Sequence, residues 1–161
     1  MRTLVAPILG ALLLGPALLA GCDSQPAPRV ANQAAVPQEA TLEVGDTRIR
    51  ASVLQTSMLN DTVARQYGIE RGDDIVMLLV GLREGAPAEE VSVPATVTAT
   101  VTDLRGRKQV VGMRELASGE LVDYVGTLQV SLPDTLAFEV SIARSGKPDS
   151  TMRFSREFFS R

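Results

Sequence analysis

The chain contains no histidine, no tryptophan and a single cysteine, Cys22. Without histidine, a Ser-His-Asp triad, a Cys-His pair and a zinc site built from histidine and cysteine are all excluded. A lone cysteine also forms no disulfide within the chain. Any catalysis would therefore have to depend on other groups such as carboxylates, and we expect no metal and no cofactor.

Basic residues are the minority, because 16 Lys and Arg stand against 19 Asp and Glu and give a formal net charge of −3. Proteins that bind nucleic acid carry a basic excess that neutralises phosphates, so we expect no nucleic-acid partner. What the chain does have is 45% hydrophobic residues over 161 positions. That composition and length are ordinary for one folded domain.

The N-terminal segment is apolar over residues 4–19 and contains Pro7 and Pro16. It falls short of the roughly 20 residues of a transmembrane helix, and prolines interrupt helices, so it is typical of an export signal. The segment ends in Leu19-Ala20-Gly21-Cys22, which resembles the lipobox of bacterial lipoproteins at every position. We therefore predict that residues 1–21 are a lipoprotein signal peptide and that Cys22 is lipidated.

The predicted anchor places the protein on a membrane of the bacterial cell envelope, facing the periplasm. Each buried methylene contributes about 0.8 kcal/mol, so two or three acyl chains hold a protein in the bilayer essentially permanently. Asp23 resembles the signal that retains lipoproteins in the inner membrane of enteric bacteria, and it favours that membrane. Residues 22–39 are rich in proline and lack an apolar period, which predicts a disordered tether before a domain at residues 40–161.

After Gln38 the chain shows short runs of Val, Ile, Thr and Leu separated by Gly, Asp or Pro at regular intervals. This pattern predicts an all-β fold, an immunoglobulin-like antiparallel β-sandwich with one short helix. The expected strands are Thr41–Val44, Arg48–Gln55, Ile75–Arg83, Val93–Thr102, Gln109–Leu116, Leu121–Val130, Leu136–Ala143 and Met152–Phe159.

Three segments give this prediction its detail. The alternation in Thr96–Thr102 puts Val97, Ala99 and Val101 on a core face and four threonines on the solvated face. The run Ile75–Val80 does not alternate, so we expect a central strand covered on both sides. Between the second and third strands, Asn60 or Asp61 can cap a short helix that Gly68 ends, with Val63 and Tyr67 lying over the open end of the sandwich.

Several spaced motifs of the predicted domain resemble those of an exported proteobacterial family, the domain of unknown function 4426, from about Thr41 to Phe159. The resemblance implies a single β-sandwich domain without an assigned activity, and it carries over no catalytic residue. The motifs are Val63-Ala64-Arg65-Gln66-Tyr67-Gly68-Ile69, Leu104-Arg105-Gly106, Met113-Arg114-Glu115, Tyr124-Val125-Gly126, Leu136-Ala137-Phe138-Glu139-Val140, Phe154 and Phe158-Phe159.

The most specific polar cluster predicted from the sequence is formed by Arg114, Glu115 and Tyr124. A hairpin between them would bring their strands side by side, and the tyrosine hydroxyl could then reach either charge. As a functional site the cluster would be a recognition patch. The structural interpretation, which we favour, is a cross-strand ion pair braced by the tyrosine.

Other charged or aromatic motifs have simpler structural interpretations. The hairpin cations Arg105, Arg107 and Lys108 could meet anionic headgroups or a carboxylate, but such a tip is more often only solvated. The pairs Asp73-Asp74 and Glu89-Glu90 lack the spaced oxygen ligands of a calcium loop. The remaining motifs are Arg71-Gly72-Asp73, which we interpret as a turn, and Phe158-Phe159, which we assign to the last strand of a sandwich core.

These observations favour a non-enzymatic binding or assembly module that presents a strand edge or loop end to another envelope protein. One alternative is a carboxylate-dependent hydrolase acting on envelope glycan, which needs two convergent acidic side chains with separated pKa values. The other is a carrier of a small apolar ligand, which needs a large apolar pocket between the sheets.

Overall fold

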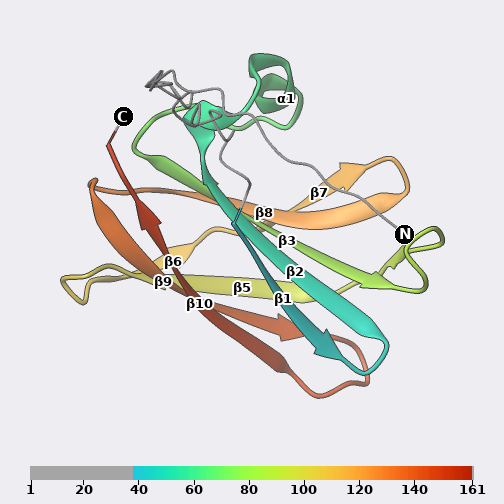
Figure 1. The fold of residues 1–161 in the computed structure, drawn as a ribbon. Coiled ribbons are helices and arrows are strands. Elements are labelled where there is room, and N and C mark those ends of the chain that lie inside the picture. The colour runs from blue at the N-terminus through green and yellow to red at the C-terminus, as the bar shows by residue number, and fades with distance from the viewer. Residues whose placement is uncertain (1–37, 161) are drawn as a thin grey trace, which may run out of the picture. The chain divides into compact units, whose positions relative to one another are not determined.

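The computed structural model describes residues 38–160, so the predicted signal peptide, the lipidation site and nearly all of the tether lie outside the described residues. The described chain forms two antiparallel sheets that pack face to face, as Figure 1 shows, and the predicted β-sandwich is confirmed. The first sheet has the order β1 (Gln38–Val44), β2 (Thr47–Gln55), β3 (Ile75–Glu84), β8 (Leu121–Gln129) and β7 (Arg114–Ser118), with β4 (Val91–Ser92) paired to the end of β3. The second sheet has the order β10 (Ser150–Phe158), β9 (Asp134–Ala143), β5 (Thr96–Thr102) and β6 (Lys108–Val111).

The core lies between the sheets and follows the two-residue period of the strands. Every second residue of β2 from Thr47 to Gln55 is buried. In β5 the inward residues Val97, Ala99 and Val101 are buried, while the threonines between them point outward, as predicted. Burial of this alternating apolar set is what holds the two layers together.

The strand β3 is covered on both faces, as its unbroken apolar sequence predicts. Val76, Leu78 and Val80 point into the sandwich and are fully buried. On the opposite face Met77 is buried in a second, smaller apolar cluster with Ile69. The prediction of a central strand is confirmed, because β2 and β8 pair with its two edges.

The segment between β2 and β3 contains a 3-10 turn, η1 (Thr56–Met58), and a short helix, α1 (Asp61–Gln66). The Asn60 side chain accepts a hydrogen bond from the amide of Thr62, which confirms the predicted N-cap, and Gly68 follows with φ of 61°. Within the described residues, no helix is long and apolar enough to cross a bilayer.

The predicted buried face of this helix is wrong. Val63 is 39% exposed, and the buried helical residue is its neighbour Ala64. Tyr67 is the C-cap, with φ of −101° and ψ of 5°, so the four-residue spacing of a regular helix does not apply to it. Tyr67 packs with Ile69 over the outer face of the first sheet rather than over the open end of the sandwich.

One expected strand is shorter in the structure, and another is divided in two. The run Val93–Thr102 is interrupted at Pro94, which has no amide hydrogen, so β5 begins at Thr96. The run Gln109–Leu116 is interrupted at Gly112 and Met113, where the chain leaves the second sheet as β6 and enters the first sheet as β7. The crossing ties the two layers together covalently (Figure 1).

One side of the sandwich is closed by side-chain contacts between β1 and β10. Arg156 donates from Nη2 to the carbonyl oxygen of Glu39 at 3.2 Å, and its guanidinium carbon lies 5.2 Å from the centroid of the Phe154 ring. That ring stacks on Phe138 at a centroid distance of 5.1 Å. On the opposite side Val111 of β6 packs against Gly126 of β8, and beyond this contact β6 and the end of β8 are separated by a cleft.

Candidate functional site: a lateral cleft beside β6

The open side of the sandwich results from the crossing of the chain between the sheets. β7 pairs with residues 121–125 of β8, and the next residues of β8 have no partner strand on that side among those the structure describes. β6 pairs with β5 along one edge, and its other edge is likewise unpaired in the described part of the chain. Two unpaired strand edges, one from each sheet, therefore flank the same opening.

Gly126 of β8 makes this crossing possible. A Cβ atom at Gly126 would lie 2.6 Å from Cγ1 of Val111, 2.8 Å from Sδ of Met113 and 2.9 Å from the carbonyl oxygen of Gly112. Side chains do not tolerate such distances, so only glycine lets the crossing segment lie directly against β8.

The opening is a cleft of about 340 Å³ between β6 and the end of β8. Its buried apolar residues come from both sheets, and its polar residues come from β6, from the ends of β8 and β9 and from the adjoining turns. The lining residues are Val101, Asp103, Arg107, Lys108, Gln109, Leu128, Gln129, Val130, Ser131, Asp134 and Leu136. An apolar floor with a polar rim suits a ligand that offers both kinds of group.

Two carboxylates of the cleft hold the β5–β6 hairpin in place. Asp103 Oδ1 accepts hydrogen bonds from the amides of Arg105 and Arg107 at 2.9 and 2.8 Å, and Oδ2 accepts one from Arg107 Nε at 2.6 Å. Asp134 Oδ1 accepts from the amide of Leu104 at 3.1 Å and from that of Thr135 at 2.8 Å. Both acids therefore serve as acceptors for the turn.

The pKa of Asp103 lies below its ordinary value. Desolvation of the carboxylate would raise the pKa, but the hydrogen bonds from Arg107 and Arg105 and the positive charge of Arg107 together lower it. A general acid in a glycosidase needs a raised pKa, so this carboxylate is shifted in the opposite direction. Lys108, also on the rim, is exposed and is paired with Thr102 in the register, and its positive charge contributes to lowering the pKa of Glu139 below its ordinary value, after the larger effect of Arg153.

The structure does not bring Arg114, Glu115 and Tyr124 together as one patch. Their strands are adjacent, as expected, with Glu115 opposite Tyr124 in the register. Tyr124 points into the sandwich, where its hydroxyl oxygen accepts from the amide of Ala95 at 2.8 Å. Arg114 points to the other face and donates to the carbonyl oxygen of Tyr67 at 2.5 Å. Arg114 and Glu115 are consecutive on one strand, so their side chains point to opposite faces of the sheet. The expected ion pair braced by the tyrosine is therefore not formed.

The remaining predicted motifs have structural partners or lie apart from the cleft. Arg71 donates to the carbonyl oxygen of Ser57 at 2.7 Å, which agrees with a turn before β3. Asp74 accepts from Gln129 Nε2 at 2.9 Å, whereas Asp73 and Glu89 are exposed. In the last motif Phe158 is buried and Phe159 is 62% exposed. Among residues 38–160 there is no group of three or more histidine, cysteine or acidic residues that could hold a metal ion.

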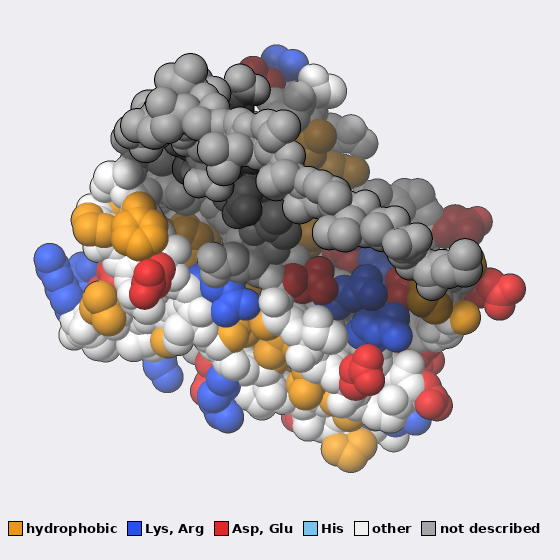
Figure 2. Space-filling model, viewed as in Figure 1, with side chains coloured by type: hydrophobic (Ala, Val, Ile, Leu, Met, Phe, Trp, Pro, Cys, Tyr) orange, Lys and Arg blue, Asp and Glu red, His pale blue; other side chains and the backbone are white. Residues whose placement is uncertain are grey.

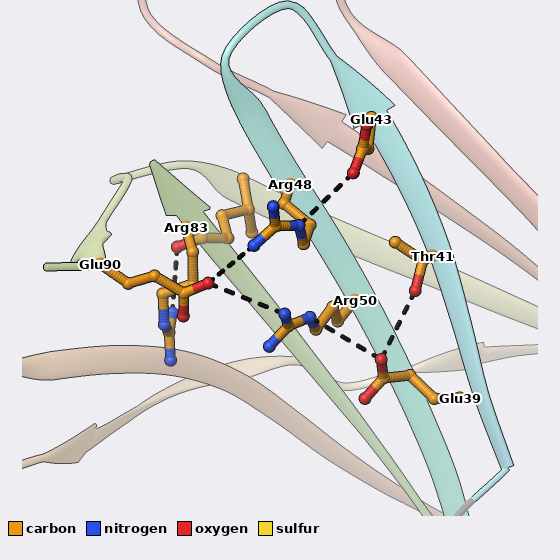
Figure 3. A network of polar contacts seen from close by, with 8 residues as sticks. Glu39, Thr41, Glu43, Arg48, Arg50, Arg83 and Glu90 are labelled. Atoms are coloured by element: carbon orange, nitrogen blue, oxygen red, sulfur yellow. Dashed lines mark hydrogen bonds and ion pairs between the residues drawn. The ribbon is translucent and has the colours of Figure 1, made fainter. Parts of the chain in front are cut away.

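A network of charged residues on the outer face of the first sheet was not predicted. Figure 3 shows Arg48 bonded to Glu90 at 2.8 Å, with Arg50 reaching both Glu90 and Glu39 at 3.7 Å. Acidic and basic side chains stand next to one another over β1 and β2 in Figure 2. The available signal was the two-residue spacing of Arg48 and Arg50, which puts them on one face of their strand, with Glu43 opposite Arg48 across the turn. Because these charges compensate one another, we assign the network to the stability of the sheet.

The fold and the cleft define an antiparallel β-sandwich with one open side. The chain belongs to the family described as "Domain of unknown function (DUF4426)", whose model matches residues 41–161, so the resemblance seen in the sequence is confirmed. No curated protein matches the chain.

Solved structures share the fold. A DUF4426 family protein (PA0388) from Pseudomonas aeruginosa PAO1 is 24% identical, with a TM-score of 0.65 over 76% of this chain and 96% of that one. FetP from uropathogenic E. coli strain F11, expressed in the periplasm, is 11% identical, with a TM-score of 0.57 over 78% and 97% of the two chains. A copper-bound variant of FetP is 12% identical, with a TM-score of 0.56 and the same coverage.

Proposed function

We propose that this protein is a lipid-anchored, non-enzymatic binding or assembly module of the cell envelope, and that it binds an extended segment of a partner protein in the lateral cleft. The observation that carries the proposal is the pair of unpaired strand edges flanking one cleft. An unpaired edge presents backbone donors and acceptors to which an extended segment can add as a further strand.

The side chains of the cleft favour a particular kind of segment. Leu128 and Leu136 form a buried apolar floor that can receive every second side chain of an extended strand. Lys108 and Arg107 lie on the rim, where a positive charge attracts acidic residues of the partner. The proposed ligand is therefore a segment in which apolar and acidic or polar residues alternate.

The anchor part of the proposal rests on the sequence. Lipidation of Cys22 would hold the domain at the periplasmic face of a membrane, with residues 23–37 as the tether, and Asp23 favours the inner membrane. The periplasmic expression of FetP, a protein with the same fold, is consistent with an exported domain. Metabolic labelling with a tagged fatty acid tests the anchor, because Cys22→Ser removes the acceptor thiol. Labelling of this variant equal to that of the wild type would contradict the proposal.

The other candidate functions gain no support from the geometry. The two carboxylates of the cleft, Asp103 and Asp134, are used as acceptors by the hairpin, which does not favour a hydrolase. The rim of the cleft is polar, which does not favour a carrier of an apolar ligand. Copper is not proposed either, since the chain has no histidine and the described residues contain no group of three or more cysteine or acidic side chains that could hold a metal ion.

Site-specific photo-crosslinking in cells tests the cleft. A photoreactive residue at Gln109, which lines the cleft, should capture a defined envelope protein, whereas the same residue at exposed Thr41 of β1 should not. Mass spectrometry of the adduct should identify an extended segment with alternating apolar and acidic residues. Lys108→Glu should weaken capture at Gln109. Equal capture at both positions, or capture unaffected by Lys108→Glu, would argue against the cleft.

A further inference from the structure

Both ends of the described chain lie at one end of the sandwich. Gln38, the first residue of β1, is paired with Val53 of β2. Two residues further along β2, the side chain of Gln55 donates from Nε2 to the carbonyl oxygen of Phe159 at 3.1 Å. We call this the entry end, and define it by Gln38, Gln55, Phe159 and the tip of the β5–β6 hairpin.

The hairpin tip belongs to the entry end because of Asp134. This residue accepts from the amide of Leu104 at the tip and is paired with Phe158 of β10 in the register. Leu104 and Phe159 therefore project from the same end of the sandwich. They are 73% and 62% exposed, and they are two exposed large apolar side chains at one end of a domain that buries the neighbouring Phe158.

Beside Leu104 the polar groups have their positive charges outward, whereas the exposed acids Asp73 and Glu157 lie near Phe159. Arg105 follows Leu104 directly and is exposed. The Arg107 side chain is 64% exposed, while that of its partner Asp103 is only 10% exposed. Exposed apolar side chains flanked by exposed guanidinium groups suit the surface of a phospholipid bilayer, where acyl chains lie beneath a layer of phosphates.

We propose that the entry end contacts the phospholipid bilayer directly: Leu104 and Phe159 enter the headgroup layer and Arg105 binds lipid phosphate. This inference rests on the proposed lipidation of Cys22. The chain between Cys22 and Gln38 enters the domain at this same end, and a flexible coil of that length reaches roughly 20–24 Å. The anchor therefore keeps the bilayer at a high effective concentration beside the two apolar side chains, so a weak contact suffices.

The contact fixes which way the domain faces. The cleft is lined by Lys108 and Asp134, close to the hairpin tip, so it opens beside the bilayer rather than toward the centre of the periplasm. A partner segment that follows or precedes a membrane anchor of its own would then lie at the right height to enter the cleft.

Fluorescence quenching in vesicles tests the orientation on the full lipidated protein. Cys22 is the only cysteine and its thiol is consumed by lipidation, so Leu104→Cys provides a single site for an environment-sensitive dye. The matched control is Ser145→Cys, an exposed position in the turn between β9 and β10 at the other end of the sandwich. In phosphatidylcholine vesicles that contain brominated lipid, the dye at position 104 should be quenched roughly twofold or more strongly than the dye at 145.

A second variant separates the contact from simple tethering. In the Leu104→Cys protein, Phe159→Ser should reduce the quenching, whereas Val110→Ser, which removes an exposed apolar side chain from β6, should leave it unchanged. Equal quenching at 104 and 145, or no effect of Phe159→Ser, would overturn the inference while leaving the anchor intact. Failure of the protein to float with the vesicles would instead show that the anchor itself is wrong.

Discussion

At the scale of single residues, the fold depends on a few positions where only one residue type fits. Gly126 admits the crossing chain, Tyr124 supplies a buried acceptor to the amide of Ala95, and Asn60 caps α1. None of these roles belongs to the cleft. Substitutions at these positions are therefore expected to change stability and to leave the proposed binding surface in place.

Gly126→Ala should lower the free energy of unfolding by about 1–3 kcal/mol, because its new methyl group overlaps with Val111, Gly112 and Met113. Gly112→Ala is the matched control, since a Cβ at Gly112 meets nothing within 4 Å. Urea denaturation of both variants measures the difference. If the two variants unfolded at the same urea concentration, the crossing would not be as close as described.

Tyr124→Phe should cost about 1–3 kcal/mol, because the amide of Ala95 loses its acceptor in a buried position. Arg114→Ala should cost about 1 kcal/mol or less, since it removes only an exposed hydrogen bond to the carbonyl oxygen of Tyr67. Thermal melts report both changes. If either variant melted like the wild type but failed to complement a deletion, that residue would belong to a recognition site after all.

At the scale of elements, the sequence predicts strands well and their pairing poorly. The alternation of Thr96–Thr102 and the unbroken run at Ile75–Val80 each reflect local burial, so both were interpreted correctly. The division at Gly112 could have been suspected, because an isolated glycine in a strand often marks a bend. That β6 and β7 join different sheets depends on long-range packing, which a local pattern does not contain.

The same limit applies to the candidate site. The hairpin that places β7 beside β8 was predicted. A shift of one residue in the pairing of two strands moves a side chain to the other face of the sheet, so the sequence did not determine whether Arg114 and Tyr124 share a face. The cleft was missed because its walls come from two separate segments, residues 101–109 and 128–136, that only the folded chain brings together. Among its lining residues, only the hairpin cations Arg107 and Lys108 were considered as ligand contacts from the sequence.

The β5–β6 hairpin should be weakened by acid. The folded-state pKa of Asp103 is below its ordinary value of 3.8, so ionised Asp103 stabilises the fold above about pH 4. This contribution is lost as the pH falls through the folded-state pKa. Asp103→Asn should therefore be less stable than the wild type at neutral pH, with a difference that shrinks below about pH 4. Urea denaturation over this pH range measures it.

The exposed residue Asp149, which has no ion pair to a described residue, provides the control for that experiment. Asp149→Asn should have the stability of the wild type at neutral pH. A difference between Asp103→Asn and the wild type that stayed constant down to about pH 2 would mean that the Asp103 charge does not stabilise the hairpin.

At the scale of the whole molecule, the described residues form one folded unit. Residues 38–160 contain both sheets, the main core and the smaller cluster under Tyr67. Attachment to the membrane and folding are therefore expected to be independent properties of the chain.

Residues 38–161 expressed alone should fold into a β-rich domain with a cooperative thermal transition, because all strand pairs are retained. Circular dichroism tests the secondary structure and the transition together. A start at Gln38 is preferable to a later one, since the carbonyl oxygen of Glu39 accepts the bond from Arg156 that closes one side. A helical spectrum or the absence of a transition would contradict the expected independence.

The crossing at Gly112 and Met113 also has a kinetic consequence. Two residues connect a strand of one sheet to a strand of the other, so neither layer can complete its pairing before the other is nearly in place. The rate-limiting step of folding should therefore assemble both layers at once. The transition state should already contain contacts between strands that are distant in the sequence. Chains with such non-local pairing fold in about milliseconds to seconds, which is slow for their size. With the proposed export signal, such a chain would stay unfolded for longer after translocation, so its unpaired strands would be open to chaperones and proteases before the sandwich closes.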